Sequence, residues 1–163
     1  MKAIFLALTL AAVAPGALAQ TTTGLSKQAS APSYGEPIPL ADAQAILDRA
    51  VRAARAANHR MAVAIVEPNG ELVAFVRMDD TQYGSILVAQ RKAETAARYR
   101  QATQTMEERT LAGRTVTLAN DDALPIAGGI PIVMGGRIVG AIGVSGASAA
   151  DDAAIAAAAL AAD

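Results

Sequence analysis

Cysteine is absent from the 163-residue sequence, which excludes disulfides, thiolate catalysis and iron–sulfur clusters together. Tryptophan is absent too, and aromatic residues make up only 3% of the chain. A core with so few rings must be built from small side chains, so its helices and strands have to approach closely to exclude water. Stability must therefore come from packing, and we expect association between copies to add to it.

An excess of positive charge is also missing. The chain has 14 Lys and Arg residues against 15 Asp and Glu residues, and its formal net charge is −1. The only adjacent basic pair in the proposed domain is Arg91-Lys92. A protein that follows a phosphate backbone would show a basic stripe and stacking aromatics, so we expect no nucleic-acid partner.

The first nineteen residues have the pattern of a secretory signal peptide. Lys2 is followed by an apolar run from Ile4 to Val13, and Ala17-Leu18-Ala19 provides a small-residue cleavage site before Gln20. The run is too short to cross a bilayer, and no later stretch reaches the roughly 18 apolar residues that a span needs. We expect cleavage to release a periplasmic or secreted protein without a membrane span. A retained N-terminal anchor is the alternative.

The mature chain divides into a linker and one domain. Residues 20–39 are rich in Thr, Ser, Ala and Pro, a composition that buries too little apolar surface to offset the entropy of ordering. Residues 40–163 have the usual size of one domain with one core. We expect a flexible linker followed by a single folded unit.

The periodicity of the apolar residues predicts two hairpins separated by helices. The expected order is a helix over 40–58, strands over 61–66 and 71–78, a helix starting at a Ser85 cap, a mostly irregular segment over 101–122 with a short helix through Met106, strands over 130–134 and 137–144, and a helix after Ser148. The pair Gly135-Gly136 suits a two-residue hairpin turn. Because each hairpin pairs its own strands, we predict the α+β class, with an antiparallel sheet of two β-hairpins covered by helices.

Several short motifs, in this order and spacing, resemble the GlcG/HbpS family of haem-binding and haem-degrading domains, which also occurs at the C-terminus of PduO-like proteins. The motifs are Val63-Ala-Ile-Val with Asn69-Gly70, Arg77-Met-Asp79, Lys92-Ala with Thr95-Ala, Gly128-Gly-Ile-Pro-Ile, Gly140-Ala-Ile-Gly-Val-Ser-Gly146, and Asp152 six residues later. The resemblance covers nearly all of residues 40–163. One departure is Glu67, where the family usually has Asp.

The resemblance implies a profilin-like fold, frequent homo-oligomers, and binding of haem or a related tetrapyrrole. Because the chain has no cysteine, any haem would be held without covalent thioether links.

The resemblance and the residues together suggest an anion-binding site. The glycines of 140–146 allow a backbone to approach a ligand, and Gly143, Ser145 and Gly146 lead into a helix start that offers free N–H donors. The same glycines also suit close packing of a strand on a helix, and both interpretations stay open. Lys92 and Thr95 share one helix face and are candidates to hold an acidic group.

Three more residues complete the candidate set. Arg77 and Asp79 close the preceding strand, near Lys92 in sequence. His59 is the only histidine and therefore a candidate iron ligand, although it also fits an ordinary polar helix exit, where the helix dipole alone favours a histidine. One histidine and no cysteine exclude a classical zinc site.

Three functions remain open on the sequence. The first is an exported haem-binding protein for uptake, storage, sensing or slow degradation. The second is an enzyme of the tautomerase, isomerase or hydrolase type that acts on a small organic acid through Lys92 and Arg77. The third is a non-catalytic oligomeric partner protein.

Overall fold

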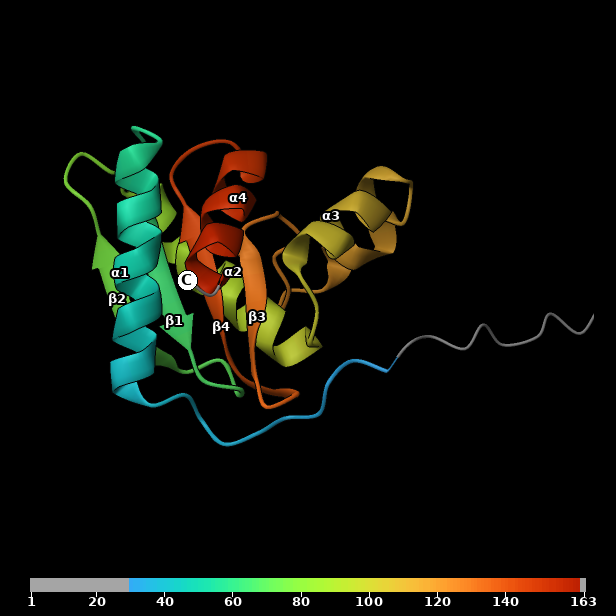
Figure 1. Ribbon diagram of the computed structural model, residues 1–163. Helices are drawn as coiled ribbons and strands as arrows, with labels where there is room; N and C mark the ends of the chain where they lie inside the picture. Colours follow the sequence, from blue (N-terminus) through green and yellow to red (C-terminus); the bar gives the residue numbers. More distant parts are fainter. Residues whose placement is uncertain (1–29, 162–163) are drawn as a thin grey trace, which may run out of the picture.

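The computed structural model describes residues 30–161, so the predicted signal peptide and residues 20–29 lie outside the described part of the chain. The elements in chain order are α1 (Leu40–Ala56), β1 (Ala62–Val66), β2 (Leu72–Arg77), α2 (Gly84–Tyr99), α3 (Thr103–Leu111), the 3₁₀ helix η1 (Thr115–Ala119), β3 (Gly129–Met134), β4 (Arg137–Ser145) and α4 (Ala149–Leu160). Figure 1 shows them along the chain.

The four strands form one antiparallel sheet in the order β2-β1-β4-β3. Each predicted hairpin is present, and the first strand of one hairpin pairs with the last strand of the other, from Ala62 opposite Ser145 to Val66 opposite Ala141. The β3–β4 turn has positive φ at Gly135 (56°) and Gly136 (75°), the backbone that favours glycine. The predicted α+β class is confirmed.

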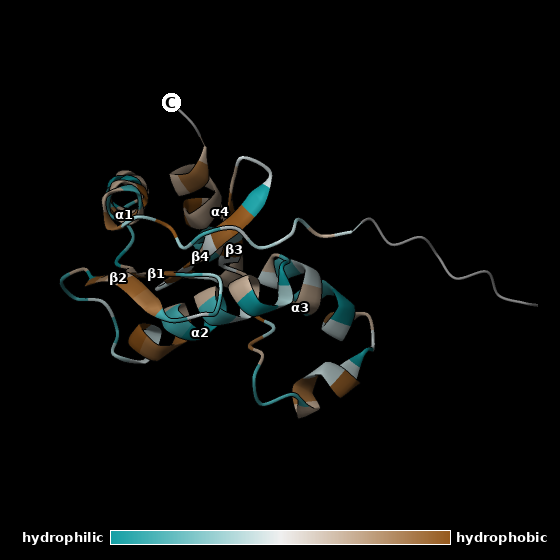
Figure 2. Ribbon diagram, turned by 90° about the horizontal axis from the view of Figure 1, so that it is seen from below, coloured by the Kyte–Doolittle hydropathy of each residue, from teal (hydrophilic) through white to brown (hydrophobic). Residues whose placement is uncertain are grey.

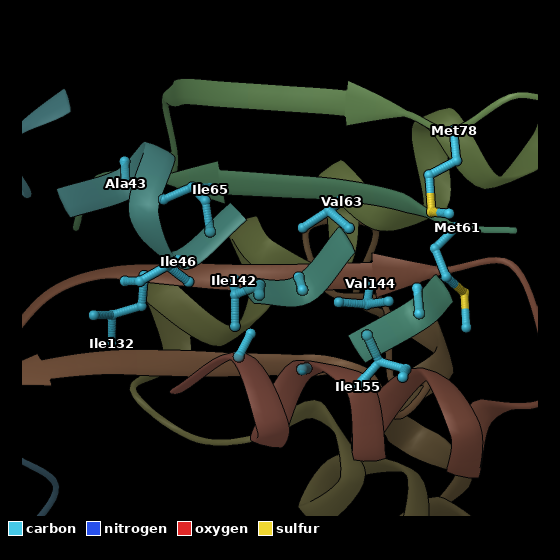
Figure 3. Close-up of a cluster of buried hydrophobic side chains, with 14 of the residues drawn as sticks. Ala43, Ile46, Met61, Val63, Ile65, Met78, Ile132, Ile142, Val144 and Ile155 are labelled. Carbon is cyan, nitrogen blue, oxygen red and sulfur yellow. The ribbon is translucent and has the colours of Figure 1, made fainter. Parts of the chain in front are cut away.

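Helices cover both faces of the sheet. Figure 2 shows α1 and α4 on one side and α2 on the other. Along β1, Val63 and Ile65 face α1 and α4, where they meet Ile142 and Val144 of β4 and Ile155 of α4 (Figure 3). The alternation of side chains along a strand therefore divides the core into two layers.

The layer beneath α2 is made almost wholly of alanine. Ala62, Ala64 and Ala141 of the sheet pack against a helix face whose members share full burial and a single methyl group: Ala89, Ala93, Ala96 and Ala97. Such short side chains let the helix backbone lie close to the strands. This is the close approach that the shortage of aromatic residues predicted.

The segment over 101–122 is more ordered than the sequence suggested. It contains α3 and η1 in place of one short helix in a loop, and these two elements stand apart from the main body in Figure 1. Ser85 also differs from expectation. It lies inside α2, whose N-cap is Tyr83, and its hydroxyl group accepts a hydrogen bond from Gln82 Nε2 (3.1 Å).

The end of the expected linker belongs to the domain. The N–H of Gly35 donates to Ile138 O and the N–H of Ile38 to Val139 O, both at 2.8 Å, so residues 33–38 run along the start of β4. Ile38 is buried in the core with 4% exposure. The folded unit therefore begins ahead of Leu40.

Within residues 30–161, no helix has the length and apolar character that crossing a membrane requires.

Candidate functional site

Lys92 is fully enclosed in the middle of α2. Its side chain is 1% exposed, and Nζ donates to Asp152 Oδ2 at 2.7 Å and to the carbonyl of Val144 at 3.1 Å. Because α2 and α4 lie on opposite faces of the sheet, this side chain links the two helix layers through the end of β4.

Asp152 is satisfied on both oxygens. Oδ2 accepts from Lys92, and Oδ1 accepts from the backbone N–H of Ala147 at 3.0 Å. The residue lies in the first turn of α4, where the helix dipole favours a negative charge. Ser148 caps the same helix by accepting from the N–H of Asp151 (3.2 Å). A buried ion pair with further hydrogen bonds to both of its members therefore holds the start of α4 to the sheet.

Gly128 covers this pair. Its φ of +122° is strained for any other residue, and a Cβ there would lie 2.9 Å from Lys92 Nζ and 2.7 Å from Val144 O. The neighbouring Gly129 packs directly on the carbonyl of Lys92. The space around the ammonium group is therefore filled by backbone.

Thr95 and the 143–146 segment are placed beside Lys92, as the sequence suggested. The Thr95 hydroxyl group donates to Arg91 O (2.7 Å) and accepts from the N–H of Leu124 (2.9 Å). Gly143 packs on the backbone of α2 at Ala89 and Ala93.

Ser145 and Gly146 lie at the end of β4. The Ser145 hydroxyl group donates to that of Ser85 at 3.2 Å, and Gly146 packs on the carbonyl of Arg60. For Gly143 and Gly146, the close-packing interpretation matches the observed contacts. Anion binding by Lys92, Thr95, Ser145 or the glycines stays a prediction.

The other three candidates lie elsewhere. His59 follows α1, has 31% side-chain exposure, and its Nε2 lies 4.0 Å from Asp151 Oδ1. Arg77 and Asp79 line a pocket at the end of α1 and β2. The structure therefore does not bring Arg77 and Lys92 into one cavity. No group of three or more His, Cys, Asp or Glu residues suited to a metal ion occurs within residues 30–161.

An open groove adjoins the Lys92–Asp152 pair and lies between α3, the start of β3 and α4. Its volume is about 440 Å³, within the range of about 300–1,000 Å³ that is usual for small-molecule sites. Its lining residues are Ala102, Gln104, Glu107, Glu108, Ala127, Gly128, Gly129, Ile130, Ala150, Ala153, Ala154 and Ala157. Gly128 belongs both to the groove and to the cover of the ion pair, so the pair positions the groove's walls.

The two sides of the groove differ in chemistry. The α4 side presents only methyl groups, at the helical spacing of Ala150, Ala153, Ala154 and Ala157. The α3 side carries two carboxylates: Glu107 accepts from the N–H of Ala127 (3.3 Å), and Glu108 accepts from Gln104 Nε2 (2.9 Å). The groove therefore has an apolar wall on one side and carboxylate oxygens, which accept hydrogen bonds or bind a cation, on the other.

A comparison with known proteins matches the part of the chain that contains these residues. The sequence model of the family described as "Haem degrading protein HbpS-like" matches residues 38–161. The chain belongs to the haem-degrading HbpS-like family. Its motifs from Val63 to Asp152, which built the resemblance, are the ones that build the sheet, the ion pair and its glycine cover.

Three relatives of this HbpS-like chain illustrate the likeness. Protein GlcG of Escherichia coli K12 is 38% identical over 103 residues, covering 63% of this chain and 77% of GlcG. The crystal structure of a double mutant of HbpS from Streptomyces reticuli has a TM-score of 0.72 and 28% identity, covering 92% of this chain and 97% of that one. A crystal structure of a PduOC–heme complex has a TM-score of 0.70 and 25% identity, covering 76% and 93%.

Sequence reasoning missed the groove and the partner of Lys92. Asp152 was part of the motif set, but nothing in the sequence links it to a lysine 60 positions earlier. The alanine spacing on α4 was visible as a helix, and only the placement of α3 turns it into the wall of a groove.

Proposed function

We propose that this HbpS-like protein is exported and binds haem without a covalent link, in the groove between α3 and α4. The observation that carries the proposal is the family match over residues 38–161, together with the similarity to a relative whose complex with heme has been crystallised. The groove's volume and its alanine wall support it, because a porphyrin is flat and largely apolar and single methyl groups let its face lie close to the helix.

The side chains that line the groove favour one candidate for the axial ligand of the haem iron. His59 does not line it, and the side chains there that carry donor atoms are Gln104, Glu107 and Glu108. Glu107 already holds the loop at Ala127, whereas Glu108 is exposed and bonded only to Gln104. We therefore propose an oxygen ligand from Glu108 for the iron, in place of His59, the candidate that the sequence offered.

Absorption spectroscopy tests the proposal. Titration of the purified protein with hemin should shift and sharpen the Soret band to saturation at micromolar concentrations. Glu108→Gln should change the band position or weaken binding, whereas His59→Ala should leave both unchanged. The absence of any Soret change in the wild type would reject haem binding, and sensitivity to His59 alone would reject the groove.

We further propose that the protein is a homo-oligomer. Three large apolar side chains are exposed on the α3–η1 arm: Leu111 (81%), Val116 (63%) and Leu118 (63%). A second copy that covers this arm would remove that surface from water. Light scattering coupled to size exclusion should give the wild type a mass that is a multiple of the monomer mass. The measured mass should be lower in the Leu111→Ser, Val116→Ser, Leu118→Ser triple variant. A monomeric wild type would reject the proposal.

A further inference from the structure

A second pocket, of about 500 Å³, lies where α1 and β2 end. It is lined by Val51, Arg55, Arg60, Val76, Arg77, Met78, Asp79 and Asp80, and we call it the arginine pocket. It shares no lining residue with the groove. What it binds therefore does not depend on whether the groove holds haem.

Three guanidinium groups reach the arginine pocket from different parts of the chain. Arg55 lies in the last turn of α1, Arg60 just before β1, and Arg77 at the end of β2. Like charges that share a pocket repel one another, and this repulsion is relieved when an anion enters.

The lining of the pocket carries a net positive charge, because it holds three arginines against two aspartates, Asp79 and Asp80. The ion pairs within residues 30–161 are His59–Asp151, Lys92–Asp152 and Arg98–Asp122, so none involves an arginine of this pocket, although Asp79 and Asp80 line it too.

The arginines also keep most of their hydrogen-bonding capacity. Arg77 donates to the carbonyl of Thr81 (3.3 Å) and lies 5.2 Å from the ring centre of Tyr83. Within residues 30–161, the side chains of Arg55 and Arg60 form no hydrogen bond. Each guanidinium therefore retains N–H donors that a ligand can use.

The rim of the pocket is held rigidly by one carbonyl group. Met61 O accepts from the N–H of Met78 (3.0 Å) and from the hydroxyl group of Thr81 (3.1 Å), so both ends of the Asp79-Asp80 turn are fixed to the residue that precedes β1. Thr81 is buried, and Asp80 is held at a φ of +61°. A rim ordered in advance loses little entropy when a ligand binds.

We propose that the arginine pocket binds a small dianion, either inorganic phosphate or a short dicarboxylate. A planar guanidinium group pairs with two oxygens of a phosphate or carboxylate at once, and three such groups around one cavity can hold both charges of the ligand. Asp79 and Asp80 oppose that attraction, which keeps the affinity modest and makes it sensitive to their removal.

Titration of the full mature protein with sodium phosphate, and separately with sodium malonate, at constant ionic strength and followed by NMR tests the proposal. We expect saturable shifts in the amide signals of residues 55–60 and 76–80. Arg60→Gln and Arg77→Gln should each weaken binding about tenfold, the loss expected for one charge-assisted pair. Asp79→Asn should strengthen it.

Arg52→Gln is the matched control. Arg52 is an exposed arginine of α1, the helix that carries Arg55, and it does not line the pocket. It should bind as the wild type does. Saturation by only one of the two anions assigns the ligand class. No saturable shift with either anion, or an equal loss in Arg52→Gln, overturns the proposal. Hemin titration of Arg60→Gln should match the wild type, so failure here and failure of haem binding are distinguishable.

Discussion

Lys92 and Asp152 place two opposite charges where their side chains are 1% and 3% exposed. Removing such groups from water is costly, and the attraction between them offsets the cost only when every other donor and acceptor is also paired. Here Val144 O accepts a second hydrogen bond from the ammonium group, and the N–H of Ala147 donates to the second carboxylate oxygen. The pair therefore holds the start of α4 and the backbone at Gly128 in place, and both of these form walls of the groove.

Removing one partner should therefore be expensive. Lys92→Met leaves the carboxylate of Asp152 buried without its countercharge, and we expect the free energy of unfolding to fall by about 3–5 kcal/mol. Urea unfolding followed by circular dichroism measures it. The control is Asp122→Asn, which breaks the exposed Arg98–Asp122 pair (35% and 55% exposed) and should cost less than about 1 kcal/mol. Equal losses in the two variants would contradict a structural role for the buried pair.

The sequence predicted that Lys92 is special without predicting why. It is the only lysine in residues 40–163, and its helix spacing relative to Thr95 was clear. Its partner depends on the tertiary packing of α4 across the sheet from α2, which no local pattern encodes. The structure gives Lys92 an internal carboxylate partner where the sequence suggested an acidic ligand.

Among the elements, β4 has the tightest surroundings. It pairs on both sides in the centre of the sheet, and Gly143 meets the backbone of α2 at Ala89 and Ala93. A methyl group there cannot be accommodated by turning a side chain, because the opposing atoms include main-chain atoms. The helix or the strand would have to move.

Gly143→Ala should therefore destabilise the protein by about 1–3 kcal/mol or more, the usual range for an overfilled core. Gly84→Ala is the control, since a Cβ at Gly84 meets nothing within 4 Å and alanine favours the helix that begins there. Thermal unfolding should show a lower midpoint for the first variant and an unchanged or higher one for the second. A stable Gly143→Ala protein would mean that α2 lies further from the sheet.

Elements with strong local patterns were predicted well, and those without were not. The Gly135-Gly136 turn and the apolar strands around it gave the second hairpin directly. The 101–122 segment has no clear period, and its α3 and η1 contact each other more than they contact the sheet. Residues 33–38 read Ser-Tyr-Gly-Glu-Pro-Ile and show no strand pattern, so their hydrogen bonds to β4 could not be inferred from composition.

For the whole molecule, export is the prediction that the N-terminal sequence carries. We expect the protein recovered from a periplasmic fraction to begin at Gln20, as measured by intact mass. Ala19→Arg should block cleavage, because the site requires small residues at its first and third positions, whereas Leu18→Gln at its middle position should be processed normally. An uncleaved wild-type protein held at the membrane would support a retained anchor.

The groove proposed to bind haem can be probed with one pair of variants on α4. Ala154 of α4 lines the groove, and Ala158, an exposed alanine of the same helix, does not. In a hemin titration followed at the Soret band, we predict that Ala154→Trp, which fills the groove, weakens binding at least about tenfold, while Ala158→Trp binds as the wild type does. Equal affinities for the two variants would reject the groove as the haem site, and no Soret change in any of the three proteins would reject haem binding.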